Sequence, residues 1–223
     1  MKTPITKKRL QDHFSYSWWK YGLLCVLAFM AWSIVYATTE YKPPEEKKVV
    51  MGVYSAASDV NATIYMQQVQ QLYMQDMELM EPHYILPDQQ YGDMVLLTRV
   101  AGQECDIYVL PTQQFQSWAS QGACQPLEII LPDLIQHLTD EGVSLSRGFR
   151  QAENTGEKHQ FGIPCRDLPG AALLLGMSEY EAADMYICVF HNTGNDENVI
   201  KFTDILVRDM MNEEIIFEPS DAQ

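Results

Sequence analysis

The segment CDIYVLPTQQFQSWASQG, residues 105–122, contains the clearest strand pattern in the chain. Its first part, Cys105–Pro111, is a short run of apolar and β-branched residues, which predicts a buried strand. Thr112 is placed to cap a following helix that closes at Gly122. The apolar residues of that helix are Phe115, Trp118 and Ala119. A buried strand that leads directly into an amphipathic helix is typical of α/β sheets.

Two similar units precede this stretch. Val49–Tyr54 and His83–Leu86 predict strands, and helical patterns follow them over 60–80 and 91–102. We expect Pro82 to end the first of these helices. The helix residues predicted to face inward are Ile64, Val69, Leu72, Tyr73, Met94, Leu97, Val100 and Ala101. Three units with short connections predict a three-layer α/β domain, with a mostly parallel sheet between helices.

Downstream the pattern is looser. Residues 144–160 predict a loop or hairpin, Phe161–Pro164 and Met185–Phe190 predict strands, and 197–211 predict a last helix after a turn over Asn192–Asn195. The domain is expected over 49–212, with an acidic tail over 213–223. The predicted core includes Val53, Val69, Leu72, Leu97, Ile107, Val109, Phe115, Val189, Phe202 and Leu206.

A segment near the N-terminus has a different character. Residues 21–39 contain no charged side chain, and a helix of 19 residues spans about 28 Å, roughly one hydrocarbon core. Five basic residues and one acidic residue lie in residues 1–20, which places residues 1–18 in the cytoplasm by the positive-inside rule. We therefore expect a transmembrane helix over 19–39 and a linker over 40–48 that lifts the domain off the outer face of the membrane.

A cleaved signal peptide is the alternative for this segment. Val35-Tyr36-Ala37 resembles a cleavage site, but the apolar stretch is longer than the usual 7–15 residues. Cys25 is no lipoprotein cysteine, because it follows Leu24 and lies early in the apolar run. A membrane anchor is the favoured interpretation.

Charge excludes one class of partner. The sequence has 223 residues with a net charge of −15, and the part after Lys20 holds ten basic and 29 acidic residues. Such a field repels phosphate backbones, so we expect no nucleic-acid binding.

Several segments, in their order, resemble the extracytoplasmic solute-binding proteins of ABC importers. The strand and helix of residues 105–122, continuing to Pro126-Leu127, are similar to that family's third-strand region. KHQFGIP (158–164) resembles the strand that leads into the family's second lobe, and YICVFHNTGNDENVIKFTDILV (186–207) resembles the returning strand and helix. The resemblance covers about Val49–Met211 and implies the fold of a type II periplasmic binding protein.

The departure from that family is large. Its second lobe usually fills well over a hundred residues between the Gly-Ile-Pro strand and the returning strand, whereas 20 residues separate Pro164 from Met185 here. Twenty residues cannot build a lobe with its own core. We therefore expect one lobe of a two-lobed clamp.

Catalytic and metal-binding patterns are weak. Gly-x-Ser-x-Gly, a phosphate-binding Gly loop and His-Glu-x-x-His do not occur. Cys165 with His159 or His191 matches no local signature of cysteine proteases. The histidines do not cluster and Cys-x-x-Cys does not occur, so we expect no catalytic residue, no metal and no cofactor.

Ligands of open α/β sheets bind beyond the carboxyl ends of the strands. That rule gives Tyr54, Ser55 and Ala56 after the first strand, and Pro111, Thr112 and Gln113 after the third. The alternative is that these residues form only loops and helix caps.

Four cysteines follow the apolar segment and allow three pairings. Cys105 begins a strand and Cys124 follows the returning helix, so a Cys105–Cys124 disulfide is one candidate, and Cys165–Cys188 is another. Burial as free thiols remains open.

The favoured function is a single-pass, membrane-anchored, bacterial extracytoplasmic module that resembles a solute-binding protein, is not an enzyme, and assists an ABC importer or another envelope complex. The first alternative is a solute receptor that completes its cleft by dimerisation or with a partner. A hydrolase is the second.

Overall fold

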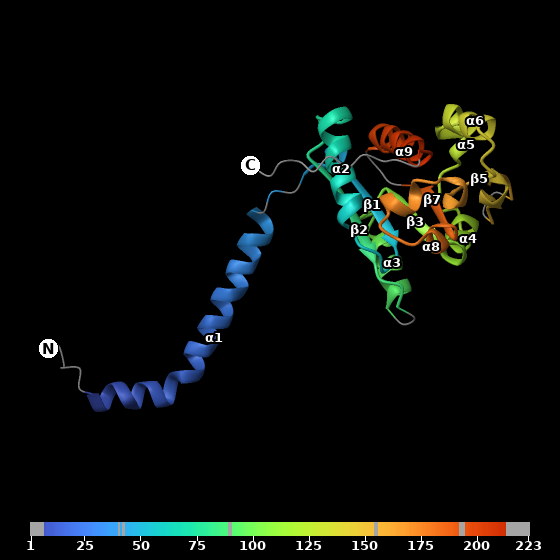
Figure 1. The fold of residues 1–223 in the computed structure, drawn as a ribbon. Helices are drawn as coiled ribbons and strands as arrows, with labels where there is room; N and C mark the ends of the chain where they lie inside the picture. Colours follow the sequence, from blue (N-terminus) through green and yellow to red (C-terminus); the bar gives the residue numbers. More distant parts are fainter. Residues whose placement is uncertain are drawn as a thin grey trace. The chain divides into compact units, whose positions relative to one another are not determined.

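The computed structural model describes residues 7–39, 41, 43–88, 91–153, 156–191 and 195–212. The chain forms two units, Met1–Lys42 and Pro43–Gln223, which are described separately below (Figure 1). The expected acidic tail lies outside the described residues, as does most of the expected turn before the last helix.

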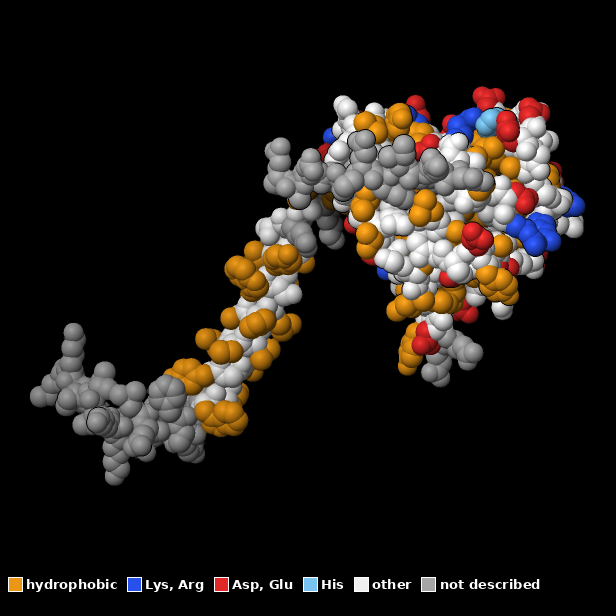
Figure 2. All heavy atoms as spheres, in the orientation of Figure 1, with side chains coloured by type: hydrophobic (Ala, Val, Ile, Leu, Met, Phe, Trp, Pro, Cys, Tyr) orange, Lys and Arg blue, Asp and Glu red, His pale blue; other side chains and the backbone are white. Residues whose placement is uncertain are grey.

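The first unit holds one long helix, α1 (Lys7–Thr39). Among the residues described, Trp18–Thr39 is the one helical segment long and apolar enough to cross a membrane: it has 22 residues, and an 18-residue window within it has a mean hydropathy of 1.8. Figure 2 shows hydrophobic side chains along this segment. A membrane anchor and a signal sequence share this length and composition.

The second unit is built on a five-stranded sheet in the order β2-β1-β3-β7-β6. Its strands are β1 (Lys48–Tyr54), β2 (Leu79–Ile85), β3 (Ile107–Pro111), β6 (Ile163–Pro164) and β7 (Met185–Val189). β1 pairs in parallel with β2 and β3, whereas β7 runs antiparallel to β3 and β6. Four of the five strands therefore point the same way. The predicted α/β fold is confirmed, and β3 is the central strand.

Both faces of the sheet are buried, because successive side chains of each strand enter different cores. In β1, Val49 and Met51 belong to one core, and Val50 and Tyr54 to the other. The first core is closed by α2 (Val60–Tyr73), α5 (Leu127–Ile130), α6 (Pro132–Asp140), α7 (Ala171–Leu174) and α9 (Asp196–Met210). The second is closed by α3 (Gly92–Ala101), α4 (Thr112–Ser120) and residues beside the hairpin of β4 (Phe149–Gln151) and β5 (Lys158–Gln160).

Pro82 does not end a helix, which corrects the expectation for residues 60–80. α2 already ends at Tyr73, and Pro82 lies inside β2. Proline lacks a backbone N–H and is tolerated in edge strands, where one side of the strand needs no partner. β2 is such an edge strand.

Two predicted core leucines are wrong. Leu97 of α3 is 55% exposed, and Met94 is exposed as well. Leu96 is buried instead, because Gly92 packs against the Tyr54 hydroxyl and fixes the rotation of the helix. Leu72 is 68% exposed in the last turn of α2, and Met74, just after the helix, fills the core there.

The four cysteines of the second unit are free, buried thiols, so neither proposed disulfide is formed. Phe190 lies between the candidates Cys105 and Cys124: it bridges to Cys124 on one side and donates its N–H to the Asp106 carbonyl on the other. Two strand spacings, about 9–10 Å in total, exceed the reach of a disulfide. Cys165 and Cys188 belong to different cores.

The connection between β6 and β7 builds no second lobe. It consists of the 3₁₀ turn η3 (Cys165–Asp167), α7 and α8 (Glu179–Ala182). The segment packs on the domain itself: Tyr84 Oη donates to the Leu175 carbonyl at 2.8 Å, and Asn61 Nδ2 donates to the Leu173 carbonyl at 2.7 Å. The expected single lobe is what the structure contains.

Candidate functional site

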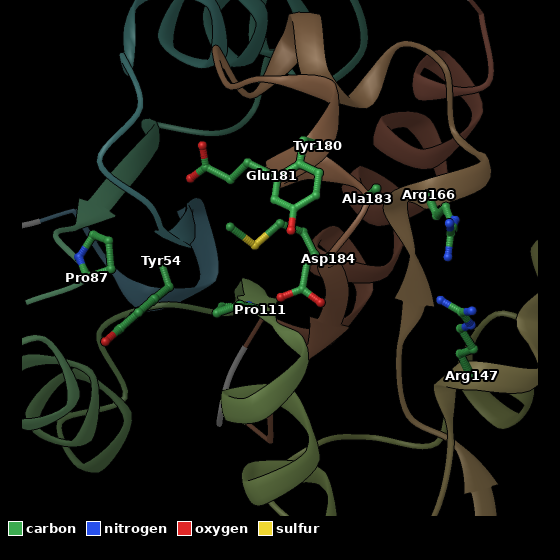
Figure 3. Close-up of a pocket in the computed structure, with 10 residues that line it drawn as sticks. Tyr54, Pro87, Pro111, Arg147, Arg166, Tyr180, Glu181, Ala183 and Asp184 are labelled. Atoms are coloured by element: carbon green, nitrogen blue, oxygen red, sulfur yellow. The ribbon is translucent and has the colours of Figure 1, made fainter. Parts of the chain in front are cut away.

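A pocket of about 560 Å³ opens at the carboxyl-end edge of the sheet (Figure 3). Tyr54 ends β1, Pro111 ends β3, and Pro87 follows the end of β2. Arg166 belongs to the turn directly after β6. The pocket therefore lies where open α/β sheets place their ligands, and its volume is within the range of small-molecule sites.

Tyr54 forms a fixed part of the wall. Its hydroxyl donates to Asp93 Oδ1 at 3.0 Å. Burial, together with Asp93, raises the pKa of the Tyr54 hydroxyl to about 12, so the group stays protonated at neutral pH. Tyr54 can thus contribute an aromatic surface and a neutral hydroxyl.

Two carboxylates line the pocket and are held from behind by hydroxyl groups. Ser55 Oγ donates to Glu181 Oε1 at 2.5 Å, and Thr112 Oγ1 donates to Asp184 Oδ1 at 2.6 Å. Glu181 is provided by α8, whose first turn is capped by the Ser178 side chain. These bonds orient both carboxylates at the edge of the sheet.

The six residues predicted to contact a ligand take different places. Tyr54 and Pro111 line the pocket. Ser55 and Thr112 stand behind it and position Glu181 and Asp184. Ala56 and Gln113 are exposed and are not among the lining residues. Ligand contact by any of the six stays a prediction.

Thr112 does not cap its own helix, which corrects that expectation. Pro111 occupies the cap position of α4, and no side chain caps the helix there. The Thr112 hydroxyl is engaged by Asp184 instead, and its backbone N–H donates to the Asp184 carbonyl at 3.0 Å. The hydroxyl thus joins α4 to the start of β7.

Sequence reasoning missed the two arginines of the pocket. Arg147 lies in the 3₁₀ turn η2 (Leu145–Gly148), and Arg166 lies in η3. They are 19 positions apart in a segment with no periodic signal, and Arg147 lies in the expected loop. No sequence motif marks them as a pair.

A metal site is not evident in the described part of the chain. No three side chains of the types His, Cys, Asp and Glu lie close enough there to hold an ion.

Solved structures share part of this architecture. An extracellular solute-binding protein of family 1 from Alicyclobacillus acidocaldarius matches 56% of this chain and 29% of its own length, at 20% identity and a TM-score of 0.40. A solute-binding protein of an ABC transporter from Agrobacterium vitis S4, solved with bound D-mannitol, matches 52% of this chain and 26% of its own, at 13% identity and a TM-score of 0.30. A cysteine mutant of OxyR from Corynebacterium glutamicum matches 94% and 76%, at 11% identity and a TM-score of 0.32.

The chain thus spans less than a third of the length of either solute-binding protein. No protein-family profile matches it, and no curated protein matches its sequence.

Proposed function

We propose that this protein is a single-pass membrane protein of a bacterial envelope that carries a non-catalytic recognition domain on the extracytoplasmic side. The domain assists an ABC importer or another envelope complex. The observation that carries the proposal is the pocket at the carboxyl ends of the strands, which is built by one lobe and is open to solvent. Tyr180 beside it is 92% exposed, so a second surface is needed to enclose whatever binds.

The N-terminal unit supports the anchored location. Trp18–Thr39 is long enough to span a bilayer, and basic residues precede it. The aromatic residues Trp18, Trp19 and Tyr36 stand near its two ends, as in interfacial belts. An excess of basic residues before the helix favours a cytoplasmic N-terminus and an extracytoplasmic domain.

The environment of Cys165 supports a non-catalytic role. Cys165 is 2% exposed and lies in the first core, and burial raises the pKa of its thiol to about 12. A thiol in that state is a poor nucleophile, because the thiolate is the reactive form. His159, a candidate general base for Cys165, has both ring nitrogens in hydrogen bonds: Nδ1 lies 2.6 Å from Glu128 Oε1, and Nε2 lies 3.2 Å from Glu157 Oε2.

Protease added to spheroplasts tests the proposed topology. We expect it to digest the domain and to spare the first twenty residues, with a C-terminal epitope tag reporting the loss of the domain. Lysed spheroplasts give the control for full digestion. Protection of the domain in intact spheroplasts, or a mature N-terminus at Thr38, would overturn the proposal.

The open wall also favours a second candidate, a receptor that closes its cleft with another copy or with a partner. A cysteine introduced at the exposed Tyr180 distinguishes the two. If two copies close the cleft, a bifunctional maleimide crosslinks the Tyr180→Cys variant into dimers, and a bound solute increases the yield. A crosslink to a different envelope protein that forms equally with and without solute supports the accessory role, whereas one whose yield rises with solute supports a cleft closed by a partner.

A further inference from the structure

Two arginine side chains converge on the pocket. Arg147 and Arg166 both line it, and Figure 3 shows their guanidinium groups pointing toward one another. Neither guanidinium has a hydrogen bond or an ion pair with a residue that the structure describes, although every other arginine of the second unit has a polar or aromatic partner. The two guanidinium groups thus face one space, and no carboxylate of a described residue pairs with either of them.

A tight backbone contact places Arg147 there. Gly148, the next residue, packs so closely on Gly162 that a Cβ at position 148 would lie 1.8 Å from the Gly162 carbonyl oxygen. The Phe161 N–H donates to the Gly148 carbonyl at 3.0 Å. The turn that carries Arg147 is therefore fixed against the segment that enters β6.

A second contact ties that turn to the one that carries Arg166. Asp167 Oδ2 accepts a hydrogen bond from the Ser144 N–H at 3.1 Å. The acid next to Arg166 thus binds the backbone that leads into η2, rather than a guanidinium. Together the two contacts hold the arginines on facing turns of one pocket.

The nearby acids do not neutralise the pair. Glu181 and Asp184 accept bonds from Ser55 and Thr112, and neither forms an ion pair with an arginine. Glu179 shares a neighbouring hollow with Arg166 and forms no ion pair with it either. Facing guanidinium groups repel each other, and an oxyanion between them removes that repulsion while accepting hydrogen bonds from both.

We propose that Arg147 and Arg166 bind the carboxylate of a small organic acid. Guanidinium groups match the two oxygens of a planar carboxylate. Glu181 and Asp184, on the other side of the pocket, accept hydrogen bonds and therefore select an acid that also carries a donor, a hydroxyl or an ammonium group. Tyr54 and Pro111 offer apolar surface for its body. The inference deepens the proposed recognition role and rests on it.

Calorimetry with the full-length protein in lipid nanodiscs tests this assignment. The probes are lactate, phenyllactate, alanine and phenylalanine. Each is paired with its primary amide, which keeps the shape of the molecule and removes the negative charge of the carboxylate. We expect at least one acid to bind and its amide to bind at least about tenfold more weakly, because hydrogen bonds to charged groups are the stronger ones. Arg147→Gln and Arg166→Gln should each weaken the binding of the acid by about tenfold or more, since each removes a charged donor.

Arg208→Gln is the matched control, because Arg208 lies on α9, pairs with Asp204 and does not line the pocket. It should bind the acid as the unchanged protein does. Equal binding of acids and amides, failure of all four acids at millimolar concentration, full affinity in the glutamine variants, or preference for inorganic phosphate each overturns the carboxylate site. The topology experiment decides the recognition role separately: a cytoplasmic domain overturns that role whatever the acids do.

Discussion

Gly148 illustrates how much one residue without a side chain can determine. A Cβ at this position would lie 1.8 Å from a backbone oxygen of Gly162, and a backbone atom cannot rotate away as a side chain can. We expect Gly148→Ala to lower the free energy of unfolding by about 1–3 kcal/mol or more, as overpacking does. Urea denaturation followed by circular dichroism measures the loss.

Gly102→Ala is a suitable comparison for Gly148→Ala. Gly102 follows α3 with helical backbone angles, and its added Cβ would meet the Thr98 carbonyl oxygen at 3.2 Å. We expect a much smaller change there. If both variants unfold at the same urea concentration, the close approach at Gly148 is not what holds the turn.

His159 gives the domain a dependence on pH. Its Nδ1 lies 2.6 Å from Glu128 Oε1 and its Nε2 lies 3.2 Å from Glu157 Oε2. The hydrogen bonds to Glu128 and then Glu157 raise the pKa of His159 above 6.5. A group whose pKa is higher in the folded state than in the unfolded state stabilises the fold. This contribution is complete at pH values below the unfolded-state pKa, and it is lost as pH rises through the folded-state pKa.

An NMR titration of the His159 ring protons should therefore give a pKa above 6.5. The stability difference between the unchanged protein and His159→Gln should shrink from pH 6 to pH 9. A pKa at or below 6.5 contradicts the charged contacts.

Among the strands and helices, β3 is the central element of the domain, and both cores depend on it. It is paired on both sides, and its side chains alternate between the cores: Ile107 and Val109 enter the first, Tyr108 and Leu110 the second. We expect Ile107→Ala to cost about 2–5 kcal/mol, because it leaves a cavity at a fully buried position. Denaturant titration measures it.

Leu97→Ala on α3 is the control for Ile107→Ala, since Leu97 is 55% exposed. Its effect should stay within roughly 0.5 kcal/mol, as is usual for surface positions. If Leu97→Ala lowers the free energy of unfolding more than Ile107→Ala does, the face of α3 that carries Leu97 is the one packed on the domain.

The buried thiols report on unfolding of the entire domain. The four cysteines of the second unit are free and at most 2% exposed, and burial raises the pKa of Cys105 to about 11. We expect all four to resist a maleimide in the native protein and to react together in denaturant, with mass spectrometry locating each adduct. A Cys105–Cys124 peptide that stays linked until reduction would show that the disulfide forms after all.

Features that depend on local composition could be predicted from the sequence alone. Residues 21–39 carry no charge, so an apolar helix follows from length alone. Ile107–Pro111 and Met185–Phe190 are apolar on both alternating faces, which indicates strands buried between two layers. The short span from Pro164 to Met185 excluded a second lobe, because a core needs more chain than that.

Features that depend on contacts between distant segments became visible in the folded domain. The rotation of α3 follows from Gly92 packing on Tyr54, and periodicity cannot reveal that choice when apolar residues lie on several faces of a short helix. Pro82 is tolerated in a strand because β2 lies at the edge of the sheet. The order of strands in a sheet cannot be predicted from the local sequence. Arg147 and Arg166 line one pocket because η2 packs on the chain entering β6, a backbone contact that no spacing rule encodes.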